Sequence, residues 1–142
     1  MPVCLDANVI ISWLVPQQQH PNVYERMDQW LEDGVEMVGP SLLFSEVVSV
    51  LRNQVARGNL AEEDAQRLLR VFFRLGIRRI DNFTLFGRAY ELATRLGHPQ
   101  AYDAHYLAAA EQESCQFWTL DRPLYQSAMG SLLFVKYAGA TP

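Results

Sequence analysis

The chain has 142 residues, of which 49% are hydrophobic and 20% are charged, and its formal net charge is −4. This length matches one ordinary domain, and the composition excludes a disordered chain. The apolar runs are short and interrupted, and no basic segment followed by an apolar stretch opens the chain. We therefore expect neither a membrane span nor a signal peptide, but a single cytoplasmic domain over residues 1–142.

The predicted elements alternate along the chain. The first strand is the apolar run at 3–5, which Asp6 follows directly, and the apolar residues continue over 8–14. A helix is predicted from Asn22 to a stop at Gly34. Further helices are predicted wherever apolar positions recur at helical spacing before a Gly or Pro signal: 40–57, 61–75, 83–96, 101–113 and a short one from Pro123. Further strands are predicted from short apolar runs: 37–38, 77–80, 117–120 and 132–135. The last few residues are expected to fray.

Strands that alternate with helices predict an α/β fold with a mainly parallel sheet covered on both faces. In such folds, binding sites lie at the carboxyl ends of the strands. Asp6 and Asp121 each follow an apolar run directly, and Asp103 begins a helix. We therefore expect these three acids to meet along one edge of the sheet.

Four acidic residues of this chain lie in apolar surroundings. They are Asp6 in VCLDANVI, Glu46 in SLLFSEVVSVL, Asp103 in AYDAHYLAAA and Asp121 in FWTLDRPL. Because bare carboxylates are costly to bury, several of them in such positions usually share a cation. Oxygen ligands without cysteine or histidine favour Mg²⁺ or Mn²⁺, and such sites usually take substrate phosphates. The pattern predicts one metal site that acts on phosphoryl groups.

Two of these acids lie inside predicted helices. Glu46 has apolar neighbours at helical spacing, and it cannot form a capping box because Leu43 stands where Ser or Thr is needed. A surface glutamate whose stem covers apolar residues remains an alternative. Asp103 shares a helical stripe with Leu107 and Ala110, so we expect it on the face that packs against the sheet. The alternative is an ordinary acid in the first turn of a helix.

The other two acids have a simpler alternative. Asp6 precedes Ala7 and Asn8, and Asp121 precedes Arg122, so each can be an aspartate that caps a helix or forms a turn. Either acid alone is weak support for a metal site. Four acids in matching contexts favour the shared cation.

Eleven of the twelve basic residues are arginine, and five of these arginines cluster in one stretch: Arg67, Arg70, Arg74, Arg78 and Arg79. One interpretation is a solvated helix face. The other is a rim that contacts phosphates. The sequence leaves both open.

These motifs resemble the PIN domain, and within that family the small VapC-type toxins of bacterial and archaeal toxin–antitoxin pairs. The resemblance spans nearly the whole chain and rests on LDANVI, SLLFSEVV, AYDAHYLAAA and TLDRPL in that order. It implies a five-stranded parallel sheet in an α/β/α sandwich. It also implies an endoribonuclease that depends on Mg²⁺ or Mn²⁺, cleaves RNA, commonly forms a homodimer and is held inactive by a small antitoxin.

The resemblance also implies a role for each motif residue. Asp6 and Asp103 would be the principal metal ligands, and Glu46 and Asp121 would bind through water or complete a second site. Asn8 and Thr119 match positions of small polar residues that orient a carboxylate or a water molecule. All four acids of the family pattern are present in this chain.

Two other functions compete with the nuclease. A strand-end aspartate such as Asp6 is also the nucleophile of haloacid-dehalogenase-like phosphatases. That mechanism needs a second aspartate two residues later, where this chain has Asn8, and its only lysine, Lys136, lies near the end. The second rival is a non-catalytic module that binds RNA or protein through the same fold.

Overall fold

The computed structural model describes residues 1–140 and contains a parallel five-stranded sheet with the strand order β3-β2-β1-β4-β5. The strands are β1 (Val3–Leu5), β2 (Met37–Pro40), β3 (Arg78–Ile80), β4 (Gln116–Thr119) and β5 (Val135–Tyr137). The helices are α1 (Ala7–Leu14), α2 (Pro21–Glu32), α3 (Ser41–Ala56), α4 (Glu62–Arg74), α5 (Phe83–Leu96), α6 (Tyr102–Gln112) and α7 (Arg122–Ala128), with a 3₁₀ turn at Pro16–Gln18. The predicted fold class is confirmed.

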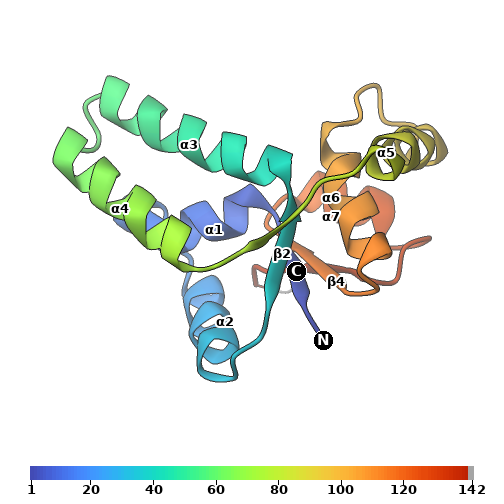
Figure 1. Cartoon of the computed structure of the whole chain (residues 1–142), viewed down its shortest axis with the longest axis horizontal. Helices are drawn as coiled ribbons and strands as arrows, with labels where there is room; N and C mark the ends of the chain where they lie inside the picture. The colour runs from blue at the N-terminus through green and yellow to red at the C-terminus, as the bar shows by residue number, and fades with distance from the viewer. Residues whose placement is uncertain (141–142) are drawn as a thin grey trace.

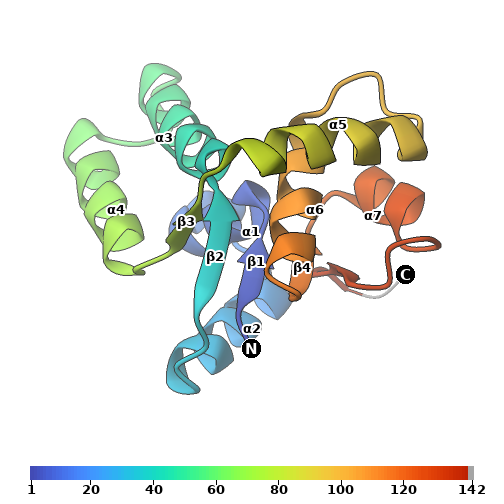
Figure 2. The same ribbon diagram turned by 45° about the vertical axis from the view of Figure 1, so that its right-hand side comes forward.

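Helices cover the sheet on both faces. In Figure 2, α6 lies in front of the central strands, and α1 and α2 lie behind them. Helix α6 packs against β1, β2 and β4, and α5 packs on α6. The long helices α3 and α4 run side by side away from the sheet (Figure 1).

The predicted elements match the observed ones closely, apart from helix α1, which was expected only as a continuing apolar run over 8–14, and the last strand. The last strand was expected at 132–135 but spans Val135–Tyr137. The reason is that Leu132 still belongs to the turn after α7, where its N–H donates to Ala128 O at 2.9 Å and its carbonyl accepts from the N–H of Val135 at 3.1 Å. Leu132 is buried, so its apolar side chain marks the core and not a strand.

The core explains why the central strand is so apolar. All three residues of β1 are buried, and the fully buried Tyr106 and Phe117 pack with their ring centroids 5.6 Å apart. Cys4 and Cys115 are free thiols, and both are buried. No helix within residues 1–140 is long and apolar enough to cross a bilayer. The expected fraying falls partly on residues 141–142, which lie outside the described residues.

A parallel sheet has two unlike edges. The strands begin at one edge, called here the amino edge, and end at the other, the carboxyl edge. Asp6 follows β1 and Leu120 follows β4 at the carboxyl edge, while α3 starts there directly after β2. Residues from distant parts of the chain therefore meet at the carboxyl edge.

Candidate acidic site at the carboxyl edge of the sheet

The four predicted acids line one cavity of about 370 Å³ at the carboxyl edge. Asp6 comes from the end of β1, Glu46 from the second turn of α3, Asp103 from the first turn of α6, and Asp121 from the start of α7. The structure thus brings together acids that are up to 115 residues apart in the chain. Sequence reasoning expected three of them at this edge, and Glu46 joins them.

Asp6 is the most buried of the four, with 6% of its surface exposed. It occupies the N-cap position of α1, but its side chain caps nothing, so the capping alternative is wrong for its carboxylate. Oδ2 instead accepts from the hydroxyl of Thr119 at 2.8 Å and from the amide of Asn8 at 3.3 Å. Burial raises the pKa of Asp6 to about 7, and the nearby Glu46 adds to the increase, although the Thr119 hydrogen bond opposes it.

Asn8 and Thr119 link the two central strands behind this carboxylate. The fully buried Thr119 accepts from the N–H of Asp121 at 2.9 Å while its hydroxyl donates to Asp6. The carbonyl oxygen of Asn8 accepts from the N–H of Leu120 at 3.0 Å. Both side chains therefore fix the position of Asp6 relative to the end of β4, contacts that are compatible with the orienting role implied by the family resemblance.

Glu46 is half-buried, and its Oε1 accepts a 2.7 Å hydrogen bond from the hydroxyl of Tyr106. Burial raises the pKa of Glu46, the Tyr106 bond lowers it, and Asp103 raises it. A glutamate with its carboxylate free at the surface, the alternative for Glu46, would have no such fixed hydrogen-bond donor. Sequence reasoning missed Tyr106, although its position in α6, three residues after Asp103, offers a signal because residues three apart share a helix face. Tyr106 is fully buried, which raises the pKa of its own phenol.

Asp103 lines the cavity, but its residue is exposed, so the expectation that it packs against the sheet is wrong. The predicted stripe fails because α6 is buried on nearly all sides after its first turn. Its buried residues are Ala104 and the run 106–110. Leu107 and Ala110 therefore do not define a single face. Desolvation still raises the pKa of Asp103, and the charge of Asp121 adds to that effect.

Asp121 combines two roles in the structure. Its Oδ1 accepts from the N–H of Leu124 at 3.0 Å, so the N-cap alternative is confirmed. The same side chain lines the cavity with the other acids. A helix cap and a place in the acidic site do not exclude each other, because a carboxylate has two oxygens and about four acceptor positions.

No basic side chain lines this cavity, and none of the four acids forms an ion pair within residues 1–140. The ligand atoms that the four acids offer to a cation are all oxygens. The most buried acid, Asp6, accepts hydrogen bonds only from the neutral side chains of Asn8 and Thr119. This donor set fits a hard divalent cation. Among the described residues, no three acidic, histidine or cysteine side chains are already close enough to enclose a metal ion. The individual ligands therefore remain a prediction.

The arginine stretch does not reach the acidic cavity. Arg67 pairs with Asp64 on the surface of α4, and Arg79 pairs with Asp81 at 3.7 Å. Arg78 lies at the amino edge and binds two glutamates there. The stretch thus supplies surface ion pairs and one structural contact, and it forms no rim around the acids.

Comparisons with known proteins agree with this geometry. A family model described as "PIN domain" matches residues 3–128. Ribonuclease VapC9 from Mycobacterium tuberculosis is 38% identical over 82 residues, a match that covers 58% of this chain and 62% of that protein. The chain thus spans less than two thirds of the length of the curated relatives it matches.

Solved structures share the fold over almost the whole chain. VapBC2 from Rickettsia felis, bound to a DNA fragment from its promoter, has a TM-score of 0.72 at 15% identity and covers 96% of this chain and 98% of its own. A toxin–antitoxin complex from Klebsiella pneumoniae has a TM-score of 0.67 at 13% identity and covers 98% and 99%. At these identities the likeness shows the fold.

Proposed function

Because the chain belongs to the PIN domain family, we propose that it is an endoribonuclease that hydrolyses RNA phosphodiester bonds with Mg²⁺ or Mn²⁺. The observation that carries the proposal is a single cavity with four acids and no basic lining residue. Two pieces of support are independent of each other. The cavity is suited to a divalent cation, and the 38% identical mycobacterial relative is named a ribonuclease.

Each acid has a proposed place in this reaction. Asp6 and Asp103 hold the cation directly, and Glu46 and Asp121 hold it through water or at a second position. A bound divalent cation supplies an acidified water molecule and stabilises the charge that develops on phosphorus. Thr119 and Asn8 keep Asp6 in a fixed orientation, and Tyr106 does the same for Glu46. A side-chain nucleophile is not required.

Ion binding would also solve an electrostatic problem. The acids repel an RNA backbone in the absence of a cation, and the chain carries a net charge of −4. Burial and the charges of neighbouring acids raise the pKa of Asp6, and a bound cation would offset both effects. The site therefore couples substrate binding to metal binding.

We further propose that the protein is the toxin of a toxin–antitoxin pair, that it forms a homodimer and that a small antitoxin protein holds it inactive. Support comes from the names of its relatives and from the structural likeness to a toxin–antitoxin complex. An RNA target agrees with the cytoplasmic location expected from the sequence. We treat residues 1–142 as one nuclease domain.

The test is a cleavage assay with purified protein and a mixture of cellular RNAs. Wild-type protein should cleave RNA with Mg²⁺ or Mn²⁺ and stop on chelation. Asp6→Asn should reduce the rate by about a hundredfold or more, because the loss of outer contacts alone costs 10- to 100-fold at metal sites. Asp28→Asn, which changes an exposed acid on α2 outside the cavity, is the matched control and should cleave normally.

Equal cleavage by wild type and Asp6→Asn would sink the nuclease proposal. Retention of RNA without metal, with no effect of Asp103→Asn, would favour the non-catalytic binding module instead. For the phosphatase alternative, the structure shows Asn8 donating its amide to Asp6, a group that cannot act as an acid. A covalent phosphate trapped on Asp6 would support that alternative.

A further inference from the structure

A second hollow adjoins the acidic cavity and contains an imidazole. Asp103 and Asp121 line both spaces, and His98, Gln100 and Ser127 line only the second. His98 is the one residue in either lining that has an imidazole or any other basic group. A strand of RNA held at Asp103 and Asp121 would therefore lie beside His98.

The loop between α5 and α6 fixes the position of His98. Gly97 ends α5 with a positive φ of 70°, and the N–H of His98 donates back to Ala93 O at 2.9 Å. Pro99 follows and restricts the backbone of His98 to extended conformations. The imidazole Nε2 lies 2.9 Å from the hydroxyl of Ser127 on α7. Both the backbone and the ring of His98 are thus held before any ligand arrives.

The partners of Ser127 favour the tautomer of His98 that has its proton on Nε2. The Ser127 hydroxyl has one hydrogen, and it donates this hydrogen to Leu124 O at 3.1 Å. With that hydrogen on Leu124 O, the hydroxyl oxygen accepts from Nε2–H in the tautomer of His98 that has its proton on Nε2. In the neutral ring this leaves a lone pair on Nδ1. Within residues 1–140, Nδ1 of His98 has no hydrogen-bond partner. It is also absent from the set of buried side-chain atoms without a partner, so Nδ1 is not fully buried.

We propose that Nδ1 of His98 accepts a hydrogen bond from a ribose 2′-hydroxyl of the bound RNA, and so helps the site to distinguish RNA from DNA. The inference rests on the proposed ribonuclease function. A neutral Nδ1 can only accept, and phosphate oxygens of the backbone have no proton to donate. The 2′-hydroxyl is the backbone group that donates, and DNA lacks it. His98 lies beside Asp103 and Asp121, so this contact would lie next to the phosphodiester linkage that the acids are proposed to hold.

The test measures binding, so it does not depend on cleavage. Fluorescence anisotropy at pH 8 with Mg²⁺ compares a single-stranded RNA with the DNA of the same sequence, using protein with Glu46→Gln, which slows hydrolysis but keeps the two acids proposed to hold the cation directly. Protein that retains His98 should bind RNA more tightly than DNA. His98→Ala should weaken RNA binding about 3- to 10-fold, the effect of one neutral hydrogen bond, and leave DNA binding unchanged.

Two isosteres separate substrate contact from a structural role. The amide of Gln reaches the position of Nε2, so His98→Gln keeps the bond to Ser127 but loses the acceptor at Nδ1. It should behave like His98→Ala. The oxygen of Asn reaches the position of Nδ1, so His98→Asn should recover part of the RNA preference. Gln126→Ala, an exposed change on α7 outside the hollow, should match the parent protein.

Three results would overturn the inference. They are a parent protein without preference for RNA, equal losses on RNA and DNA in His98→Ala, and normal RNA preference in His98→Gln. Equal losses would indicate a phosphate contact or a role in folding. The wild-type cleavage assay reports separately on the proposed function. If wild type cleaves RNA while the RNA preference does not depend on His98, only this inference fails.

Discussion

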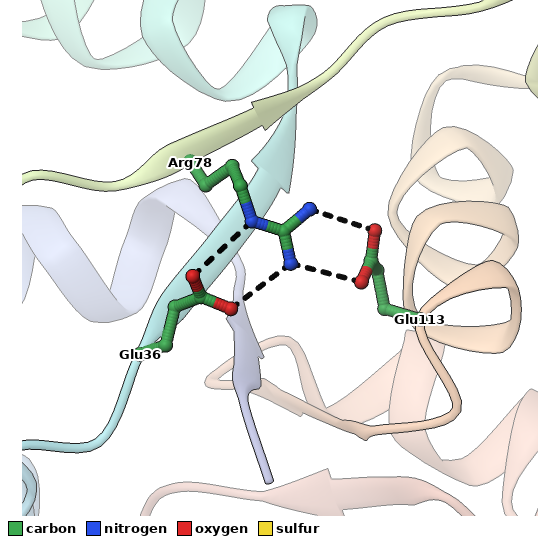
Figure 3. Close-up of polar contacts among 3 residues, drawn as sticks. All are labelled: Glu36, Arg78 and Glu113. Atoms are coloured by element: carbon green, nitrogen blue, oxygen red, sulfur yellow. Dashed lines mark hydrogen bonds and ion pairs between the residues drawn. The ribbon is translucent and has the colours of Figure 1, made fainter.

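The two edges of the sheet handle negative charge in opposite ways. At the amino edge, the guanidinium of Arg78 lies between Glu36 and Glu113 and binds both carboxylates in bidentate fashion (Figure 3). The four N–O distances lie between 2.9 and 3.2 Å. At the carboxyl edge, four acids line one cavity that has no basic residue in its lining.

The pKa values of the acids shift in opposite directions at the two edges. Hydrogen bonds from Arg78 lower the pKa of Glu36 and of Glu113. Burial and mutual repulsion raise the pKa of Asp6, Glu46 and Asp103. The amino edge carries its counterion within the chain, and its acids serve the fold. The carboxyl edge is destabilised by its own ionised acids, which is the arrangement expected of a site that takes its cation from solution.

The largest expected effect is the pH dependence of the unfolding free energy of the metal-free protein, which would sharpen the contrast between the two edges. The pKa of Asp6 is about 7 in the folded protein against an ordinary value of 3.8, so folding favours the protonated form. The contribution of Asp6 to stability should therefore be greatest below pH 4, fall as pH rises to 7 and level off above that. At 1.36 kcal/mol per pKa unit, the full loss is about 4 kcal/mol. Asp6→Asn should avoid this loss, because its amide oxygen can still accept from Thr119.

Denaturant unfolding in the presence of a chelator, at intervals from pH 4 to pH 8, measures this difference. The gap in unfolding free energy between Asp6→Asn and wild type should widen with pH. Asp28→Asn serves as the reference for a carboxylate on the surface, and its gap should stay flat. A constant gap for Asp6→Asn would show that the carboxyl edge does not carry an unneutralised buried charge.

The next effect should come from adding a divalent cation. An ion that binds only the folded protein stabilises it by about 2.7 kcal/mol at one hundred times its dissociation constant. Mn²⁺ or Mg²⁺ should therefore raise the unfolding free energy of wild type at pH 8 and much less that of Asp6→Asn. Thermal melts with and without ion check this. Stabilisation of both proteins to the same degree would place the ion elsewhere and break the comparison.

Much of the fold can be predicted from this sequence because its signals are local. Gly and Pro mark most helix ends, and short apolar runs mark the strands. The last strand was misplaced because Leu132 is buried within a turn, and an apolar run does not distinguish these environments. The parallel sheet follows from the alternation of strands and helices, which needs no knowledge of distant contacts.

The candidate site was predictable in its members but not in its contacts. The acids stand out in apolar segments, and Asn8 and Thr119 were expected to orient a carboxylate. Tyr106 was missed because its partner, Glu46, lies 60 residues away in the chain. The exposure of Asp103 was missed because a helix buried on nearly all sides has no single apolar face to read. Local periodicity carries no information on such tertiary contacts.

The smallest effect concerns the amino edge, where two carboxylates already share one guanidinium. Arg78→Gln leaves Glu36 and Glu113 facing each other without a cation, so the protein should lose some stability. The loss should be small because Arg78 and Glu36 are solvent-exposed, where salt and water screen the charges. Melting temperatures of the variant and wild type at low and high salt measure it, and Arg67→Gln, in a similar exposed pair on α4, is the control. Added Mn²⁺ should stabilise Arg78→Gln as much as wild type, since the proposed ion site lies at the other edge. If the Arg78→Gln protein instead lost its response to Mn²⁺, the two edges would be coupled, and the division between a structural edge and a functional edge would be wrong.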